Sequence, residues 1–407
     1  MERNDVLLVS PPSRMDSHYR PPLGLMYVAS YYRDIGLSVR IADYPFAENI
    51  RNANFWRKRD EMVSQCKVKV LNEVYNTNPK LIGISCYSTE YNEVLSLIKD
   101  IRKISKADII VGGIHPTLKP HDFDGIAQIH QGRLDKGYAC YDLVDMKHYL
   151  EPNPYLIRGV LLKGMYIVSG FGCPNQCTFC VASTLKQYFK SESKTPQVLY
   201  DEVVMLKDKY GIDGFYIIDD LYTINKEKVK EFCSLVAKTG LIWGCCSRVN
   251  TVDEETIKQM SKAGCIQLDF GVERGSNEAL QRLKKGITIE QIKETFRLCE
   301  KYHLRTFANF LVNIPEETKK DREDIEKLVC KIKPTITCIN IYEYYEGCKL
   351  GLASIPDSDL LQWKRRCMLN SNWNSGIKWS SLKHLKLKYY KALSLVIKEG
   401  LNQLFSQ

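Results

Sequence analysis

The first third of the chain alternates between short apolar runs and longer stretches with helical periodicity. The runs that we interpret as strands are Val6–Ser10, Ser38–Ala42, Leu81–Cys86 and Ala107–Val111, and the alternation stops after Gln128–Gln131. The helical stretches between them are Pro22–Ile35, Glu48–Thr77 and Tyr91–Lys103. Alternating strands and helices are typical of a parallel, doubly wound sheet. The pattern predicts an α/β domain over residues 1–145, with Cys140–Asn153 interpreted as a linker.

The alternation then resumes over a longer segment. Six further strands are predicted at Met165–Ser169, Phe215–Ile218, Leu241–Cys245, Ile266–Gly271, Arg305–Val312 and Ile336–Ile341. Helical patterns lie between them at Pro196–Tyr210, Lys226–Thr239, Glu254–Ala263, Ile289–His303 and Lys319–Ile332. Asp253 is suited to cap the start of the third of these helices, and Gly264 its end. Six strand–helix units predict a partial, TIM-like (β/α)6 barrel over residues 155–350, open on one side.

Residues 351–407 are predicted to form a basic helical C-terminal region. Its apolar stripe at helical spacing is Leu382, Leu385, Tyr389, Leu393 and Val396, with lysines beside it. The lysines can form a solvated helix face or bind nucleic acid or an acidic partner. Three of the five tryptophans of the chain also lie here, namely Trp363, Trp373 and Trp379. They can pack over the open side of the barrel or form a substrate lid.

Composition and cysteine usage narrow the class of protein. The 407 residues are 44% hydrophobic, carry a net charge of +10 and include 15 cysteines, most of them isolated in apolar segments. Such cysteines behave as small buried hydrophobes in a reducing compartment. The sequence shows neither a transmembrane stretch nor a secretory signal at its start. We therefore expect a cytoplasmic protein, and the cysteine content suggests an anaerobic setting.

One cysteine cluster has a spacing that carries chemistry. Cys173, Cys177 and Cys180 form a C-x3-C-x2-C motif directly after the first predicted barrel strand. Three thiolates can bind three irons of a [4Fe–4S] cluster and leave the fourth iron open to S-adenosylmethionine (SAM). One electron from such a cluster cleaves SAM to a 5′-deoxyadenosyl radical. A structural zinc site would need four ligands, usually in two pairs, and no second Cys/His pair follows nearby.

Polar residues follow several of the predicted barrel strands. Asp219 and Asp220 end the second strand, Arg248 the third, Glu273 the fourth and Asn313 the fifth. Barrel enzymes place their active sites at the carboxyl ends of the strands. Each of these residues alone could be a strand-end cap or part of a surface ion pair, but together they predict a site beside the cysteines.

These motifs resemble those of a known family. Residues 165–350 look like the radical SAM superfamily, and residues 4–350 resemble its cobalamin (B12)-binding branch, the B12-dependent radical SAM methylases and their relatives. The segments that carry the resemblance are Pro22–Met26, Leu81–Ser85, Val111–Thr117, Gly172–Cys180, Ile218–Asp220 and Phe270–Ser276. The resemblance implies a Rossmann-like cobalamin-binding domain before the barrel.

It also implies roles for individual residues. Glu273 would contact the SAM ribose, Arg248 the SAM carboxylate, and the backbone of Phe179 the adenine. The wider set assigned to SAM is Phe179, Asp219, Asp220, Arg248, Glu273, Ser276 and Asn313. The set assigned to cobalamin is Ser85, Ser88, Thr89, Gly112 and Gly113.

The sequence departs from the family pattern at three places. Relatives usually carry Gly-x-Pro-Gly-Glu-Thr after the fifth barrel strand, where this chain has Asn313–Thr318. They commonly carry Gly-Glu-Gly-Glu after the fifth strand of the first domain, where this chain has Gln131–Leu134. The segment Asp16–Pro21 nearly matches Asp-x-His-x-x-Gly, the signature of proteins that ligate cobalt through histidine, but has Pro21 at the glycine position. His18 is therefore interpreted as a loop residue.

The predicted activity is transfer of a methyl group from methylcobalamin to an unactivated carbon, with an electron donor such as flavodoxin or ferredoxin. Cyclisation or rearrangement, with or without cobalamin, is an alternative, because related proteins perform such reactions with the same domains. A methylthiotransferase is less favoured, because Cys66, Cys86 and Cys140 do not fit the pattern of its second cluster. A non-enzymatic binding module with a structural cluster is a further alternative. The substrate class stays open among small metabolites, lipid precursors and peptide side chains, and no nucleic-acid partner is expected.

Overall fold

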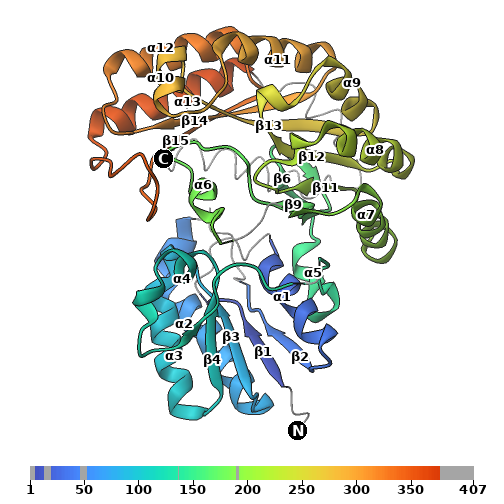
Figure 1. Ribbon diagram of the computed structural model, residues 1–407, viewed down its shortest axis with the longest axis vertical. Coiled ribbons are helices and arrows are strands. Elements are labelled where there is room, and N and C mark those ends of the chain that lie inside the picture. Colours follow the sequence, from blue (N-terminus) through green and yellow to red (C-terminus); the bar gives the residue numbers. More distant parts are fainter. Residues whose placement is uncertain (1–4, 13–19, 46–52, 136, 189–191, 376–407) are drawn as a thin grey trace. The chain divides into compact units, whose positions relative to one another are not determined.

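The computed structural model describes residues 5–12, 20–45, 53–135, 137–188 and 192–375, with the side chains of residues 53–57 and 373–375 left aside. The described chain forms two compact units that divide between Glu151 and Pro152. Figure 1 labels their elements. No helix among the described residues is both long enough and apolar enough to cross a lipid bilayer.

The first unit contains a five-stranded parallel sheet with the strand order β2-β1-β3-β4-β5. Its strands are β1 (Val6–Val9), β2 (Val39–Ala42), β3 (Leu81–Ser85), β4 (Asp108–Gly112) and β5 (Gln128–Ile129). Its main helices are α1 (Leu23–Asp34), α2 (Ala53–Thr77), α3 (Tyr91–Ile104) and α4 (Ile114–Leu118). In this order the chain changes direction between β1 and β3, the switch point at which doubly wound sheets bind ligands. The predicted doubly wound fold is confirmed.

The segment Cys140–Asn153 is not the linker that the sequence suggested. It contains the turn η3 (Tyr141–Leu143) and the short helix α5 (Met146–Tyr149), and it packs on the first unit. The Cys140 amide donates to the Met26 carbonyl at 3.0 Å, Arg33 pairs with Asp142, and the Tyr149 hydroxyl donates to Asp43. The apolar residues of this segment are too few and too irregularly spaced to show a period, so only the three-dimensional packing reveals that they are buried.

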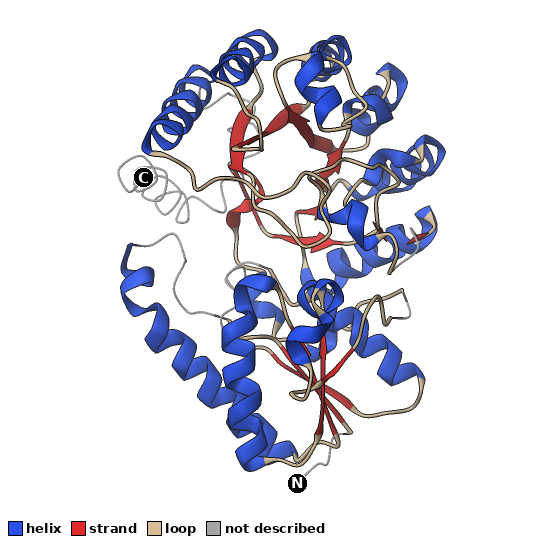
Figure 2. Cartoon of the chain, turned by 60° about the vertical axis from the view of Figure 1, so that its left-hand side comes forward, coloured by secondary structure: helices blue, strands red, loops and turns tan. Residues whose placement is uncertain are grey.

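The second unit contains a six-stranded, all-parallel sheet with the order β15-β14-β13-β12-β11-β8. Figure 2 shows strands in red and helices in blue. Its strands are β8 (Gly164–Ile167), β11 (Gly214–Ile217), β12 (Ile242–Ser247), β13 (Cys265–Glu273), β14 (Arg305–Val312) and β15 (Ile336–Ile341). The connecting helices include α7 (Pro196–Tyr210), α8 (Lys226–Val236), α9 (Glu254–Lys262), α10 (Asn277–Arg282), α11 (Ile289–Lys301) and α12 (Lys319–Ile332). All six predicted strands and all five predicted helices are present, and Asp253 caps α9 by accepting from the Thr256 amide.

Two antiparallel strand pairs lie outside the predicted alternation. β6 (Asn153–Ile157) and β7 (Val160–Leu162) form a hairpin, whose buried side chains pack against Tyr216 and Ile266 of the barrel. β9 (Gly170–Phe171) and β10 (Glu192–Ser193) form a second, shorter pair. The hairpin falls in an almost continuously apolar stretch, where periodicity does not separate one strand from the next.

Part of the C-terminal region is described. Helix α13 (Ser358–Ser375) packs along β15, where the Thr337 amide donates to the Asn372 side chain at 2.8 Å and the Asn372 amide donates back to the Thr337 carbonyl. The helical prediction is therefore met up to residue 375. The predicted apolar stripe from Leu382 to Val396 lies outside the described residues, as do Trp379 and the near-motif with His18.

We predict that Gly113→Ala destabilises the first unit far more than Gly125→Ala does. Both glycines have positive φ, at 108° and 71°. A Cβ at Gly113 would lie 2.8 Å from the Cys86 carbonyl oxygen, whereas a Cβ at Gly125 would meet nothing within 4 Å. The expected loss is about 3 kcal/mol at Gly113, from backbone strain and overpacking, against about 1 kcal/mol at Gly125. Urea unfolding measures both, and equal losses would contradict the close packing of Gly113.

Candidate functional site

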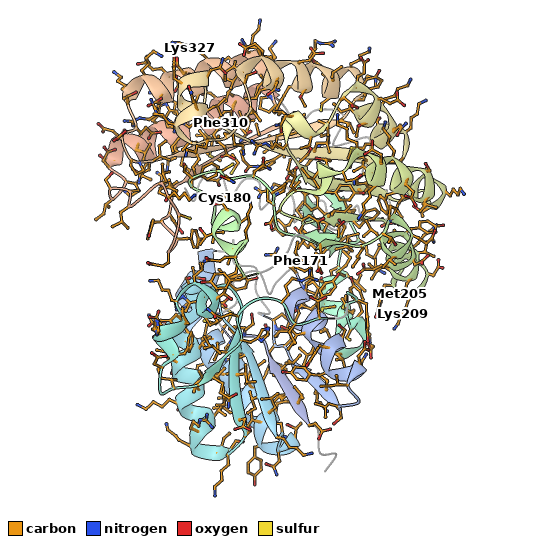
Figure 3. All side chains as sticks on the ribbon, viewed as in Figure 1. Phe171, Cys180, Met205, Lys209, Phe310 and Lys327 are labelled. Atoms are coloured by element: carbon orange, nitrogen blue, oxygen red, sulfur yellow. The ribbon has the colours of Figure 1, made fainter. Side chains whose placement is uncertain are left out.

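The three motif cysteines lie in one loop between β9 and helix α6 (Val181–Leu185). Cys177 is buried, Cys173 and Cys180 are half-buried, and Cys180 stands at the start of α6, where Figure 3 labels it. The Ser183 hydroxyl donates to the carbonyls of Cys177 and Cys180, at 3.1 and 2.7 Å. The Lys186 ammonium donates to the carbonyls of Pro174 and Asn175. Ser183 of α6 and Lys186, directly after this helix, therefore hold the backbone of the loop.

The surroundings of the thiols suit a metal cluster. The pKa of Cys180 is raised to about 11, mainly by burial, with smaller contributions in the same direction from Cys177, Asp220 and Cys173. Two N–H donors lie beside the other sulfurs: Asn175 Nδ2 is 3.1 Å from Cys173 Sγ, and Arg248 Nη1 is 3.6 Å from Cys177 Sγ. Metal binding removes thiol protons outright, so burial is compatible with ligation. Such N–H···S contacts commonly surround cluster thiolates.

The three thiols are not arranged to bind one ion together. Within the residues that the structure describes, no group of three His, Cys, Asp or Glu side chains could hold a single metal ion. In a cubane cluster each thiolate binds a different iron. A cluster of this kind therefore does not require three side chains gathered around one ion.

Asp219 and Asp220 follow β11 and connect it to the entrance of the cysteine loop. Asp219 is 7% exposed and accepts from the Ser169 amide at 2.8 Å and from the Ser169 hydroxyl. Burial raises the pKa of Asp219 to about 6, although these hydrogen bonds favour the carboxylate. Asp220 accepts from the Gly172 amide at 3.0 Å, next to Cys173. Both carboxylates therefore position the loop, a role that the sequence did not suggest.

Glu273 is the last residue of β13 and lies in the left-handed region, with φ 68°. Its Oε1 accepts from Lys285 Nζ at 2.9 Å, and both side chains of this ion pair are largely buried. The same ammonium lies 5.6 Å from the centre of the Phe179 ring, within cation–π range. Lys285 therefore links two residues that the resemblance assigned to SAM. The sequence did not indicate a role for Lys285, because this residue lies in a polar stretch that follows α10.

The remaining strand-end residues have structural partners as well. Arg248 is 6% exposed, and its Nε donates to Asn250 at 2.9 Å. Asn313 donates from its side chain to the Ser354 carbonyl at 2.7 Å. Ser276 caps α10 by accepting from the Ala279 amide.

The departure at Asn313–Thr318 keeps the backbone shape that glycine would allow. Asn313 and Glu316 occupy the two positions where relatives carry glycine, and their φ angles are 63° and 62°. The left-handed region costs a residue with a side chain roughly 1 kcal/mol relative to glycine, and asparagine tolerates it best. The Asn313 amide also donates to Glu317 Oε2 at 2.9 Å, which fixes the turn.

The residues assigned to cobalamin lie at one edge of the first sheet. Ser85 ends β3 and pairs in register with Gly112 at the end of β4. Ser88 and Thr89 are exposed in the turn η1 (Ser88–Glu90), directly after β3. The Cys86 amide donates to the Gly112 carbonyl at 2.8 Å, and this hydrogen bond joins the segment after β3 to the end of β4. The structure thus brings the five residues to the carboxyl edge of β3 and β4, where such sheets bind ligands.

Comparison with known proteins agrees with this division. Residues 167–329 match the radical SAM superfamily, and residues 17–133 match the B12 binding domain. An uncharacterized methyltransferase of Pyrococcus horikoshii is 25% identical over 88% of this chain and 85% of its own length. The cytidylyl-2-hydroxyethylphosphonate methyltransferase of Streptomyces wedmorensis is 24% identical over 79% of this chain and 75% of its own. Proteins named as cyclases and methylthiotransferases also match.

Among solved structures, the fold resembles that of the radical SAM methyltransferase TsrM from Kitasatospora setae, with cobalamin and a [4Fe–4S] cluster bound. The TM-score is 0.66 at 18% identity, and the match covers 86% of this chain and 74% of TsrM. The predicted fold class, enzyme class and cofactors agree with these matches. The chain therefore belongs to the radical SAM superfamily, in the branch that carries a B12-binding domain.

Proposed function

We propose that this enzyme transfers a methyl group to an unactivated carbon, using a [4Fe–4S] cluster, SAM and cobalamin. Cys173, Cys177 and Cys180 would ligate the cluster, and an external flavodoxin or ferredoxin would supply electrons. The observation that carries the proposal is the three-cysteine loop at the carboxyl end of a six-stranded barrel, in a chain that also has a B12-binding domain.

The cofactors would supply chemistry that ordinary alkylation lacks. An unactivated carbon has no lone pair to attack the SAM methyl group, so the bound cluster and SAM would supply a radical for hydrogen abstraction, and bound cobalamin would supply the methyl group. The chain's own residues bind and orient. Glu273, held by Lys285, can accept from the ribose hydroxyls, and Arg248 can meet the SAM carboxylate from its buried position.

Two alternatives differ in what they require of the chain. Radical cyclisation or rearrangement would use the same residues, and only product analysis separates it from methylation. A methylthiotransferase would need further cysteines for a second cluster. Cys86 is part of the core of the first unit and Cys66 packs in a separate cluster with Tyr44, and burial raises the pKa of Cys86 to about 12. Both behave as packing residues, which disfavours this alternative.

We predict that alanine at Cys173, Cys177 or Cys180 abolishes the iron–sulfur absorbance and the formation of 5′-deoxyadenosine together. The reason is that each thiolate would hold its own iron. Alanine at Cys233 or Cys299 should leave both the absorbance and SAM cleavage unchanged, because these cysteines are buried packing residues of helices α8 and α11, outside the three-cysteine motif. Reconstituted wild-type protein should hold about four irons per chain for one cluster, against about eight for two. SAM cleavage that persists in Cys177→Ala would refute the assignment.

A second prediction concerns cobalamin and the product. Protein purified without oxygen and supplied with hydroxocobalamin should retain about one cobalt per chain through gel filtration, as expected for one B12-binding domain. With substrate and SAM carrying a deuterated methyl group, the label should appear in the product together with 5′-deoxyadenosine and S-adenosylhomocysteine. Cobalt retention without label transfer would indicate cyclisation or rearrangement instead.

A third prediction concerns Arg248. Its N–H···S contact with Cys177 should stabilise the reduced, more negative cluster, so Arg248→Gln should shift the midpoint potential to a more negative value. Asn175→Ala should act in the same direction through Cys173. Spectroelectrochemical titration without SAM measures both. Arg297→Gln, which removes an exposed ion pair with Glu294, is the matched control and should leave the potential unchanged.

A further inference from the structure

A buried histidine in the first unit contacts one of the residues assigned to cobalamin at the carboxyl edge of β3 and β4. His115 lies in α4, directly after the Gly112-Gly113 turn, and is only 4% exposed. Its Nδ1 lies 3.0 Å from the hydroxyl of Ser88, which is exposed at the end of β3. Its Nε2 lies 3.1 Å from Asp122 Oδ2. The three side chains form a chain from a carboxylate, through a buried imidazole, to an exposed hydroxyl.

The imidazole ring is fixed by its neighbours. Tyr91 packs against it with ring centres 4.6 Å apart, and Phe123 contacts its edge at 5.9 Å. The Tyr91 hydroxyl donates to the Asp122 backbone carbonyl at 3.0 Å, which ties the carboxylate-bearing turn η2 (Pro120–Phe123) to α3. The His115 amide donates to the Cys86 carbonyl. Tyr91 and Phe123 therefore pack against the buried ring from two sides and limit its rotation.

The neighbours also select the tautomer. A deprotonated Nε2 would face the carboxylate of Asp122 with two lone pairs opposed, so the proton lies on Nε2, although the contact is not linear enough for an ideal hydrogen bond. Burial lowers the pKa of His115, while Asp122 raises it and Lys119 lowers it further. The neutral ring then accepts at Nδ1, and Ser88 must donate its only hydroxyl proton inward. Its lone pairs face outward from the sheet edge.

We propose that Asp122 and His115 act as positioning residues that hold the Ser88 hydroxyl as a hydrogen-bond acceptor for an amide N–H of the corrinoid. This inference rests on the proposed function, because the ligand is the cobalamin of the B12-binding domain. Primary amides around the rim of a corrin ring supply such donors. The site fits them because a serine whose proton is committed inward can only accept, whereas an unrestrained serine would alternate between donating and accepting.

The experiment compares cobalamin affinity across variants of the full chain. Ser88→Ala should weaken hydroxocobalamin binding about fivefold, the effect of one lost neutral hydrogen bond. His115→Gln removes the acceptor at the Nδ1 position and should weaken binding to the same extent, whereas His115→Asn places an oxygen near that position and should restore most of it. The double variant Ser88→Ala/His115→Gln should bind no more weakly than Ser88→Ala alone, because His115 acts only through Ser88.

The chain offers a matched control. His121 and Asp124 also lie 3.1 Å apart, but both are largely exposed, so His121→Ala should leave affinity unchanged. A second measurement does not depend on cobalamin: imidazole ¹⁵N spectra of the apoprotein should show His115 with an unprotonated Nδ1, whose shift changes in Ser88→Ala.

The outcomes separate this inference from the proposed function. Wild-type protein that fails to bind cobalamin would refute both. Tight binding by wild-type protein together with full affinity in Ser88→Ala, or additive losses in the double variant, would refute the positioning role alone. A protonated Nδ1 in the spectra would also refute it, because the Ser88 hydroxyl would then be the acceptor of the histidine proton.

Discussion

The cysteine loop depends on two carboxylates that the sequence marked for a different role. Asp219 holds both the amide and the hydroxyl of Ser169, and Asp220 holds the amide of Gly172. These bonds join the end of β11 to the end of β8 and to the first residue before Cys173. Burial raises the pKa of Asp219 to about 6, and the hydrogen bonds from Ser169 act in the opposite direction by favouring the carboxylate. Three cysteines can bind one cluster only if their loop has a fixed shape, and the two carboxylates that follow β11 help to fix it.

The parallel topology of the barrel explains which strand-end residues the sequence could place at one edge of the sheet. Parallel strands end at the same edge of a sheet, so polar residues at the ends of successive strands come together without any knowledge of their contacts. Glu273, Arg248 and Asp220 were identified in this way. The parallel strands and main helices of both units followed from the alternation, because long helices such as α7 and α12 span several turns and are capped at their starts by Thr195 and Thr318.

The residues that the sequence did not reveal are distinguished only by their three-dimensional surroundings. Lys285 and His115 stand out in the structure only because of what surrounds them, and neither lies at the end of a predicted strand or in a spaced motif of reactive residues. Lys285 and His115 are buried by residues distant in the sequence, and the residues next to them in the chain do not indicate this burial. The burial of Tyr149 and the β6–β7 hairpin were missed for the related reason that their apolar residues show no clear period.

The two sites also position their outer residues in comparable ways. At the barrel, Lys285 is nearly buried and gains its partner in Glu273, so the glutamate carries a fixed orientation into the site. In the first unit, Asp122 gives His115 a fixed proton, and the histidine gives Ser88 a fixed direction. In each case the group at the site is positioned by a second residue behind it. Replacing Glu273 would leave the Lys285 ammonium without its partner, and replacing Ser88 would leave His115 Nδ1 without its donor. Variants at Lys285 and Asp122 keep the residue at the site and therefore test its positioning more directly.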